Sequence, residues 1–191
     1  MKKMYLLPIL VILAVGSAMA ILPSMMTSSS STSDGLQYHA VVCKEVYRAD
    51  GTVEDIGCGS NILVNNGRNM IQDRMTGSQT GNLSVINVGG NLTAMTTAST
   101  NISNIFNAAS GLSPAVGAIY NATDPLTQVG NTSVTHTFTA AADNLYVNQT
   151  GLSNESLLVT SGAALFAGEG FTNVVLQTND QLNVTWYWWV S

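Results

Sequence analysis

The chain carries one long segment of alternating residues, Leu182-Asn183-Val184-Thr185-Trp186-Tyr187-Trp188-Trp189-Val190. Successive side chains of a β-strand point to opposite faces, so this alternation predicts a strand with one apolar face. The apolar face consists of Leu182, Val184, Trp186, Trp188 and Val190. We expect this face to lie in a core. On the other face, we expect Tyr187 and Trp189 to pack across strands or against a neighbouring subunit.

Shorter segments before it follow a similar pattern. In Val134–Ala140, apolar or aromatic residues alternate with threonine, which is typical of a half-buried strand. Glycines separate the apolar runs Leu157–Thr160, Ala164–Ala167 and Phe171–Gln177, and a turn at Thr178-Asn179-Asp180 leads into the last strand. Short strands joined by Gly and Asn turns predict an all-β fold, an antiparallel β-sandwich of immunoglobulin-like or jelly-roll-like type.

A hairpin is expected near the start of the folded region. Asp50-Gly51 is a strong turn signal between two flanks rich in Val and Ile. A two-residue turn pairs Ala49 with Thr52 and places Cys43 directly opposite Cys58, and a four-residue loop keeps the same partners but changes the parity of the pair. Two cysteines in an exported chain favour one bridge, so we predict a Cys43–Cys58 disulfide. The alternative is a metal site, but two cysteines with no nearby histidine pair do not supply four ligands.

One short helix is expected after this hairpin. Met70, Ile71 and Met75 fall on one helical face, and Gly77 is placed to cap the end of the helix. The following stretch, Gly81–Ser113, is rich in Asn, Thr, Ser and Gly with scattered apolar residues. It predicts short strands joined by polar loops.

The first residues have the features of a secretory signal. Lys2 and Lys3 precede an apolar run that ends in Ala18-Met19-Ala20, the small-x-small pattern at which signal peptidase cleaves. We therefore expect residues 1–20 to be a signal peptide. Whether residues 4–26 are instead retained as a helix stays open at this point.

The rest of the chain divides into a tail and a domain. Residues 21–35 contain an apolar tail followed by Thr27–Ser33, a run of Ser and Thr typical of a flexible linker. Residues 36–191 are long enough for one domain with a sizeable core. We expect this domain to be the β-sandwich and the tail to be extended.

Charged residues are scarce in this chain. They make up 9% of the sequence, against 46% hydrophobic residues, and no lysine or arginine follows Arg74. Nucleic acid and anionic membranes are poor partners for such a chain, because both require a basic surface. Together with the signal and the paired cysteines, the composition predicts a secreted protein at the extracellular cell surface.

Asparagine followed by x-Ser or x-Thr occurs eight times, about twice as often as random placement would give. This sequon is the acceptor for N-linked glycans, which hydrate a surface that is poor in charge. We predict N-glycosylation at Asn82, Asn91, Asn101, Asn121, Asn131, Asn148, Asn154 and Asn183. Asn183 is the weakest of these sites because it lies inside a predicted strand.

Residues suited to catalysis or metal binding form no recognisable pattern. The two histidines, His39 and His136, both fall in predicted strands, and no Ser-His-Asp arrangement follows from their positions. The carboxylates are scattered singly except for Glu54-Asp55, and the glycines lack the lysine of a phosphate-binding loop. We therefore expect no enzyme activity, no cofactor, no metal and no small-molecule substrate.

Taken together, a signal, an apolar tail, a polar linker and a glycosylated β domain resemble the subunits of archaeal extracellular filaments of the thread and bundling-pilus type. The carboxy-terminal half resembles small β-sandwich proteins of archaeal surfaces and of some virions through the motifs Phe138–Ala140, Gly151-Leu152, Ala164–Phe171 and Asp180–Trp186. The resemblance implies a homopolymer formed by donor-strand complementation, in which the tail of one subunit completes the sheet of the next. The implied donor residues are Ile21, Leu22, Met25 and Met26, and Pro23 departs from a regular strand there.

These expectations give one functional hypothesis and several alternatives. The hypothesis is a structural subunit of a cell-surface filament, with a role in adhesion or biofilm formation. The alternatives are a glycosylated monomeric adhesin, an S-layer-associated module, a type IV pilin-like protein and a virion structural protein with the same sandwich. A filament subunit polymerises through its tail, whereas a monomeric adhesin stays discrete.

Overall fold

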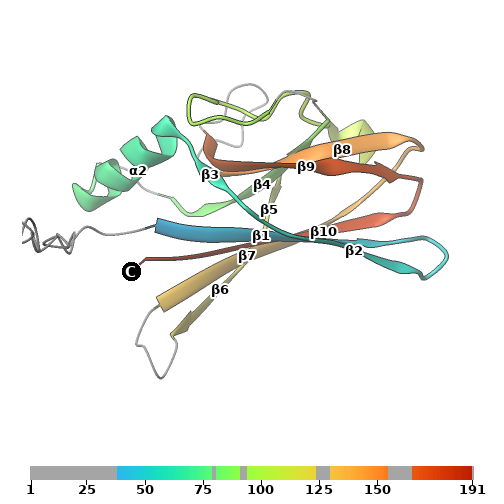
Figure 1. Ribbon diagram of the computed structural model, residues 1–191, viewed down its shortest axis with the longest axis horizontal. Coiled ribbons are helices and arrows are strands. Elements are labelled where there is room, and N and C mark those ends of the chain that lie inside the picture. Colours follow the sequence, from blue (N-terminus) through green and yellow to red (C-terminus); the bar gives the residue numbers. More distant parts are fainter. Residues whose placement is uncertain (1–37, 79–80, 91–93, 124–129, 155–164, 191) are drawn as a thin grey trace, which may run out of the picture. The chain divides into compact units, whose positions relative to one another are not determined.

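The computed structural model describes residues 38–78, 81–90, 94–123, 130–154 and 165–190 (Figure 1). Contacts within the chain group residues 36–191 into one unit. Two five-stranded antiparallel sheets make up this unit and pack against each other, so the predicted all-β antiparallel sandwich is confirmed.

Each sheet mixes strands from distant parts of the chain. Sheet A has the spatial order β2 (Val53–Ser60), β1 (Tyr38–Tyr47), β10 (Gln181–Val190), β7 (Gly130–Thr139) and β6 (Ala118–Thr123). Sheet B has the order β3 (Ile62–Leu63), β9 (Leu165–Leu176), β8 (Leu145–Asn154), β4 (Leu83–Gly89) and β5 (Ala115–Val116). Figure 1 shows the sheets as two layers, with the helix α2 (Asn65–Met75) beside β3. A short 3-10 helix, η2, spans Ala108–Ser110.

The alternating segment near the end of the chain forms the middle strand of sheet A. This strand, β10, pairs with β1 on one side and with β7 on the other. Leu182, Val184 and Trp186 are fully buried, whereas Tyr187 is 44% exposed on the opposite face. The alternation therefore sets which face of sheet A meets sheet B.

The core lies between the facing sides of the two sheets. Burial of each large apolar side chain there contributes roughly 1.5–3 kcal/mol, so the contact between the sheets is the main source of stability. The largest fully buried side chains are Trp186, Phe138, Ile86, Leu112, Leu152, Leu165, Leu176 and Leu182.

The predicted hairpin is formed by β1 and β2, but its turn has neither of the two expected lengths. The Arg48 N–H donates to the Thr52 carbonyl at 2.8 Å, and the Gly51 N–H donates to the Arg48 carbonyl at 2.9 Å. The loop therefore has three residues, and the predicted pairing of Ala49 with Thr52 is wrong. Gly51 has a φ of +89°, which a residue without a Cβ adopts readily.

The predicted disulfide is nevertheless confirmed. A bulge at Ile56 shifts the register between Lys44 and Glu45, and this shift cancels the one that the three-residue loop introduced. Cys43 therefore lies opposite Cys58 and is bonded to it, with their Cα atoms 4.0 Å apart. This spacing is close to that of a non-hydrogen-bonded antiparallel pair, the arrangement that brings side chains nearest to each other.

The strands of sheet B differ from the predictions. Ala164–Ala167 and Phe171–Gln177 were predicted as separate strands, but Leu165–Leu176 is one strand, β9, that passes through Gly168 and Gly170. Both glycines pair in regular register with β8, Gly168 with Gly151 and Gly170 with Gln149, and the register shifts, which are typical of bulges, lie on either side of this stretch. β8 itself was not predicted, and the predicted strand Leu157–Thr160 lies outside the described residues.

The single predicted helix is α2, and Gly77, with a φ of +74°, follows its last turn as predicted. Met70 is buried, but Met75 is 74% exposed, so the predicted apolar face does not extend to the end of the helix. Gly67 brings the helix onto sheet B, because a Cβ at this position would lie 2.0 Å from the Phe166 carbonyl oxygen.

Candidate docking groove

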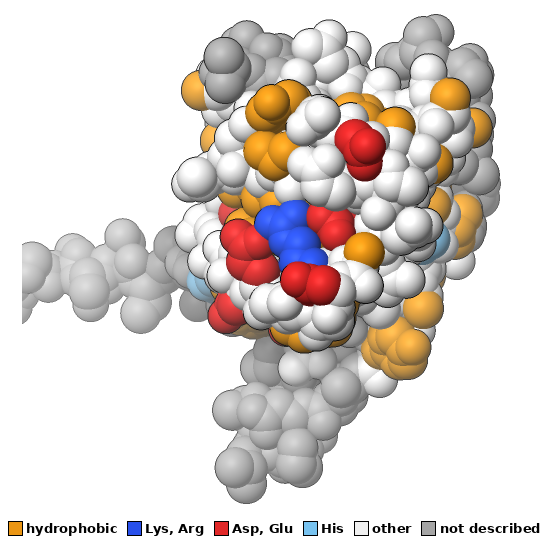
Figure 2. All heavy atoms as spheres, turned by 90° about the vertical axis from the view of Figure 1, so that its right-hand side faces the viewer, with side chains coloured by type: hydrophobic (Ala, Val, Ile, Leu, Met, Phe, Trp, Pro, Cys, Tyr) orange, Lys and Arg blue, Asp and Glu red, His pale blue; other side chains and the backbone are white. Residues whose placement is uncertain are grey.

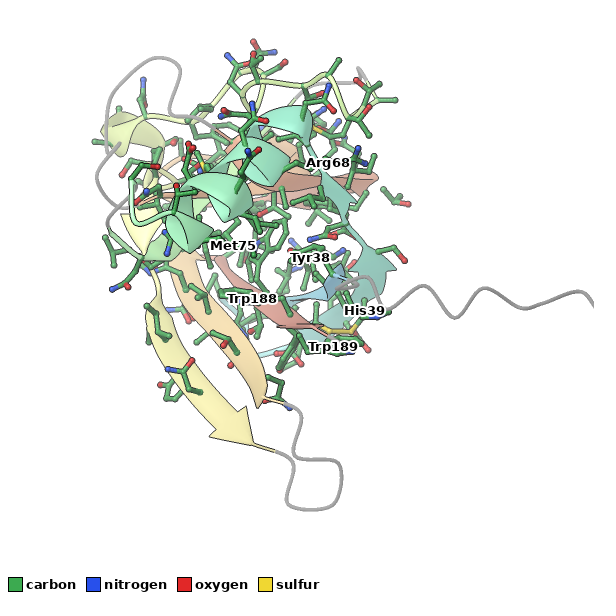
Figure 3. All side chains as sticks on the ribbon, turned by 90° about the vertical axis from the view of Figure 1, so that its left-hand side faces the viewer. Tyr38, His39, Arg68, Met75, Trp188 and Trp189 are labelled. Atoms are coloured by element: carbon green, nitrogen blue, oxygen red, sulfur yellow. A yellow bond between two sulfur atoms is a disulfide. The ribbon has the colours of Figure 1, made fainter. Side chains whose placement is uncertain are left out.

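Within the described residues, the structure provides no cluster of side chains suited to metal binding and no helix long and apolar enough to cross a membrane. The His136 ring is half-buried and packs edge-on against Phe138, with 4.6 Å between ring centroids, and burial lowers the pKa of His136. The His39 ring stacks on Trp189 at 5.3 Å, and Figure 3 shows the two side by side. Both histidines therefore pack against aromatic rings.

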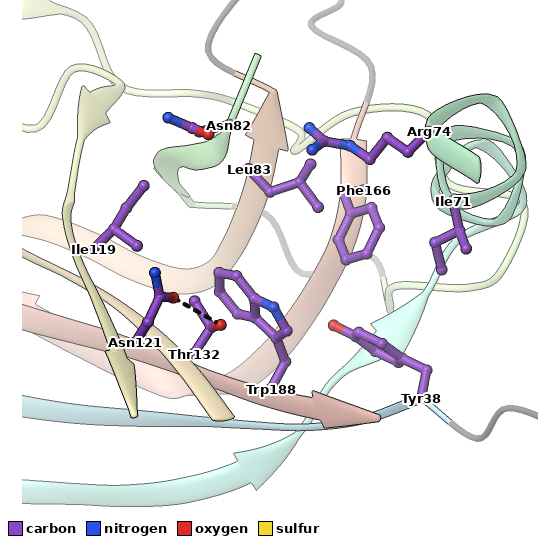
Figure 4. Close-up of a pocket in the computed structure, with 10 residues that line it drawn as sticks. All are labelled: Tyr38, Ile71, Arg74, Asn82, Leu83, Ile119, Asn121, Thr132, Phe166 and Trp188. Carbon is purple, nitrogen blue, oxygen red and sulfur yellow. Dashed lines mark hydrogen bonds between the residues drawn. The ribbon is translucent and has the colours of Figure 1, made fainter. Parts of the chain in front are cut away.

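A largely apolar groove with a volume of about 410 Å³ lies at one end of the sandwich (Figure 4). We call it the docking groove. Side chains from both sheets and from α2 line it, so it opens between the layers. Its apolar lining consists of Tyr38, Ile71, Leu83, Ile119, Phe166 and Trp188.

The docking groove exists because β5 and β6 belong to different sheets. β5 pairs with β4 in sheet B, and the Gly117 N–H then donates to the Ser84 carbonyl at 2.8 Å. After Gly117 the chain joins sheet A as β6, which leaves Leu83 and Ile119 on separate layers with the groove between them. Gly117 permits this crossing, because a Cβ there would lie 2.5 Å from a methyl carbon of Val134.

Aromatic rings form the floor of the docking groove. Tyr38 and Phe166 meet edge to face with 5.6 Å between ring centroids, and Trp188 reaches the groove from β10. Burial raises the pKa of Tyr38 to about 12, although the hydrogen bond that Asn61 donates to its hydroxyl at 3.2 Å acts in the opposite direction. Trp188 is only half-buried, so part of a large apolar ring faces solvent in the groove.

Polar groups lie at the rim of the docking groove. The Thr132 hydroxyl donates to the Asn121 side-chain oxygen at 3.0 Å, across β7 and β6. Arg74 donates through Nη2 to the Gly81 carbonyl, and its Nε is buried without a hydrogen-bond partner among the described residues. A buried donor without a partner is costly.

The strand beside the docking groove has an open edge. In the described part of the chain, β6 is the last strand of sheet A and pairs with β7 alone. Ile119 and Tyr120 on this strand are 39% and 61% exposed. An open edge next to an apolar groove is the arrangement that binds an extended segment, because main-chain hydrogen bonds and side-chain burial are both available.

The predicted glycosylation sites divide by exposure. Asn82, Asn101, Asn121 and Asn131 are exposed, and Asn183 is half-buried and accepts hydrogen bonds from Thr135 and Thr137. Asn148 and Asn154 are 7% and 0% exposed in β8, where the folded chain leaves no room for a sugar on the side chain. Asn91 lies outside the described residues. Occupancy of these sites stays a prediction, and the fold favours the four exposed ones.

Asn82 and Asn121 both line the docking groove, a proximity that the sequence spacing did not indicate. The predicted donor residues, Ile21, Leu22, Met25 and Met26, lie outside the described residues. The groove that would receive them was also absent from the sequence-based prediction, because its lining residues come from seven separate strands and helices.

The search for related proteins gave no match: no protein-family model, no curated protein and no solved structure matches this chain.

Proposed function

We propose that the protein is a structural subunit of an extracellular filament, in which the tail of one copy docks in the docking groove of the next. The observation that carries the proposal is the groove itself, an apolar opening between the two layers beside the open edge of β6. Head-to-tail contacts of this kind join different surfaces of identical subunits, so they do not saturate in a dimer and they extend into a filament.

The sequence provides a suitable occupant for the docking groove. Residues 21–26 contain four large apolar side chains, and the linker Thr27–Ser33 is seven residues long. Such a linker spans about 23 Å when extended, enough to carry the tail onto a neighbouring copy. The apolar side chains of the tail match the aromatic floor formed by Tyr38, Phe166 and Trp188.

The docked tail would combine two kinds of interaction. One edge of the tail can pair with the free edge of β6, while alternate side chains enter the groove. Arg74 lines the groove, so we expect its guanidinium group to donate to a tail carbonyl. Pro23 removes one main-chain donor, so we expect it to face away from β6.

The predicted glycosylation fits a role outside the cell in this proposal. The exposed sequons and the scarcity of charge fit a surface hydrated by sugars, and the disulfide fits an oxidising compartment. Asn82 and Asn121 lie at the groove, so glycans on them would flank a docked tail. A discrete adhesin with the same fold remains the second candidate, and its tail would stay outside the groove of other copies.

Deleting residues 21–26 tests the proposal directly. The truncated protein should fold with the melting temperature of the full chain, because the tail belongs to a neighbour, and it should form no filaments under electron microscopy. Replacing Ile21 and Leu22 with serine should weaken assembly by removing roughly 1.5–3 kcal/mol of burial per side chain. Filaments of normal appearance from the truncated protein contradict the proposal, and a lowered melting temperature indicates that each tail folds back on its own domain.

A further inference from the structure

The core contains one ion pair that the proposed assembly does not use. Lys44 Nζ lies 2.5 Å from Glu169 Oε1, and the two side chains are 2% and 5% exposed. Lys44 comes from β1 in sheet A and Glu169 from β9 in sheet B, so the contact joins the two layers. No sequence pattern indicated this pair, because the two residues are 125 positions apart.

The surroundings of this pair are tightly fitted. The Lys44 nitrogen lies 4.9 Å from the centre of the Phe171 ring. A Cβ on Gly59 would lie 2.0 Å from Glu169 Oε1, so the glycine makes the space that the carboxyl group occupies. Glu169 Oε2 is buried and has no hydrogen-bond partner among the described residues.

As an ion pair, this arrangement is poorly satisfied. Burying two charges costs several kcal/mol per ion unless further hydrogen bonds complete both groups. One carboxylate oxygen of Glu169 lacks such a bond, and burial raises the pKa of this group, an effect that the nearby Lys44 only partly offsets. The surroundings therefore favour the neutral carboxylic acid form of Glu169.

We propose that Lys44 and Glu169 condense to an amide, which links the two sheets covalently. A proton passes from Nζ to Oε1, which leaves a neutral amine beside a carboxylic acid. The Nζ lone pair then attacks Cδ and forms the C–N bond. The bond from Cδ to Oε1 breaks, and Oε1 leaves as water with a second proton from Nζ. Oε2 becomes the amide carbonyl oxygen, so one ammonium and one carboxylate give one amide and one water.

Two features of the fold drive this condensation. The sheets hold the amine and the carboxyl group in contact, and groups fixed in this way react as if present at effective concentrations of about 10⁵ M or more. Glu169 also lines a cleft of about 570 Å³ together with Asn148 and Gln149, which gives the released water a way out of the core. The product is neutral, so the cost of two buried charges disappears.

The sequence makes the test unambiguous, because Lys44 is the only lysine after Lys3. The full chain is expressed, shown to melt cooperatively, then denatured, reduced and digested for peptide mapping by mass spectrometry. We expect a branched peptide that contains Lys44 and Glu169 and is lighter by one water than the two linear peptides together. Trypsin should fail to cut after Lys44, because the cross-linked side chain no longer carries an amine.

The control is Lys44→Met, which keeps a long side chain in the core but has no nucleophile. It should show the full mass and a linear peptide around Glu169. Two linear peptides with a free Lys44 amine in the folded wild-type protein overturn the proposal. The proposal is also overturned if the Lys44→Met protein is lighter by one water, because the dehydration then occurs at another residue. The result does not depend on filament assembly, so the two proposals stand or fall separately.

Discussion

Single asparagines decide where glycans can attach to this fold. The acceptor motif is complete at all eight asparagines, but strand alternation and packing give these asparagines different exposures. Asn148 and Asn154 are buried in β8 although each is followed by a complete acceptor motif. The motif is a local pattern of three residues, whereas burial depends on β9 and β4, which flank β8 in sheet B.

We predict that Asn82, Asn101, Asn121 and Asn131 carry glycans in the native host. Peptide mapping of the native protein should show modified peptides at these four sites and unmodified Asn154. Glycan on Asn154, which is fully buried, would mean that the sugar is added before β8 is in place. A native mass equal to that of the unmodified mature chain would refute glycosylation as a whole.

Among the structural elements, the two turns at one end of the sandwich are joined by Asp180. Figure 2 shows this end, with basic atoms surrounded by acidic ones. Asp180 accepts hydrogen bonds from Arg48 Nη1 at 2.8 Å, from the Ala49 N–H at 2.9 Å and from the Gln177 N–H at 2.9 Å. It therefore ties the β1–β2 turn to the β9–β10 turn.

The Asp180 contacts predict a loss of stability in acid. Burial alone would raise the pKa of Asp180, but hydrogen bonds from the Gln177 N–H, Arg48 and the Ala49 N–H outweigh it and lower the pKa. A carboxyl group with a lowered folded-state pKa stabilises the fold above its unfolded pKa of about 3.9. That contribution is lost as pH falls through the folded-state pKa. Denaturation curves between neutral pH and pH of about 2 should show this loss.

Asp180→Asn should lower the free energy of unfolding at neutral pH by about 3 kcal/mol, because it leaves three donors facing a group that accepts fewer hydrogen bonds. The variant should also lose part of the acid dependence of the wild-type protein. Asp55→Asn on the same hairpin is the matched control, because Asp55 is exposed and accepts a hydrogen bond from the nearby Gly57 N–H. Equal effects of the two substitutions would contradict the role given to Asp180.

The elements also show how far the sequence predicts this fold. Alternation of apolar and polar residues correctly predicted the strands that have one apolar face and one polar face, such as β10 and β7. It missed β8, whose Asn148 to Asn154 segment is buried although mostly polar, because sheet B places those polar groups beside other polar groups. The prediction of the hairpin was right about the disulfide and wrong about the turn. Turn length and bulge position depend on packing beyond the local sequence.

For the molecule as a whole, the sequence predicted a tail but not the site that receives it. The apolar side chains of residues 21–26 and their linker are contiguous, so a pattern reveals them. The docking groove combines Tyr38, Leu83, Ile119, Phe166 and Trp188, which only the sandwich topology brings together. The Lys44–Glu169 contact is likewise a product of topology.

The central claim, that a tail docks in the groove of another copy, requires two separable surfaces on each subunit. Ile119→Asp places a charge in the docking groove and leaves the tail intact, since Ile119 is a partly exposed lining residue. Val116→Asp is the matched control, because Val116 is 44% exposed and does not line the groove. We expect the Ile119→Asp protein to stay monomeric and the Val116→Asp protein to assemble.

The most direct test mixes the Ile119→Asp protein with the protein that lacks residues 21–26 and measures mass by light scattering after size-exclusion chromatography. One partner supplies an intact tail and the other an intact groove, so the mixture should form a one-to-one dimer and nothing larger. Each protein alone should remain a monomer. Filaments from either protein alone, or a mixture that stays monomeric while the wild-type chain assembles, would contradict docking of the tail in this groove.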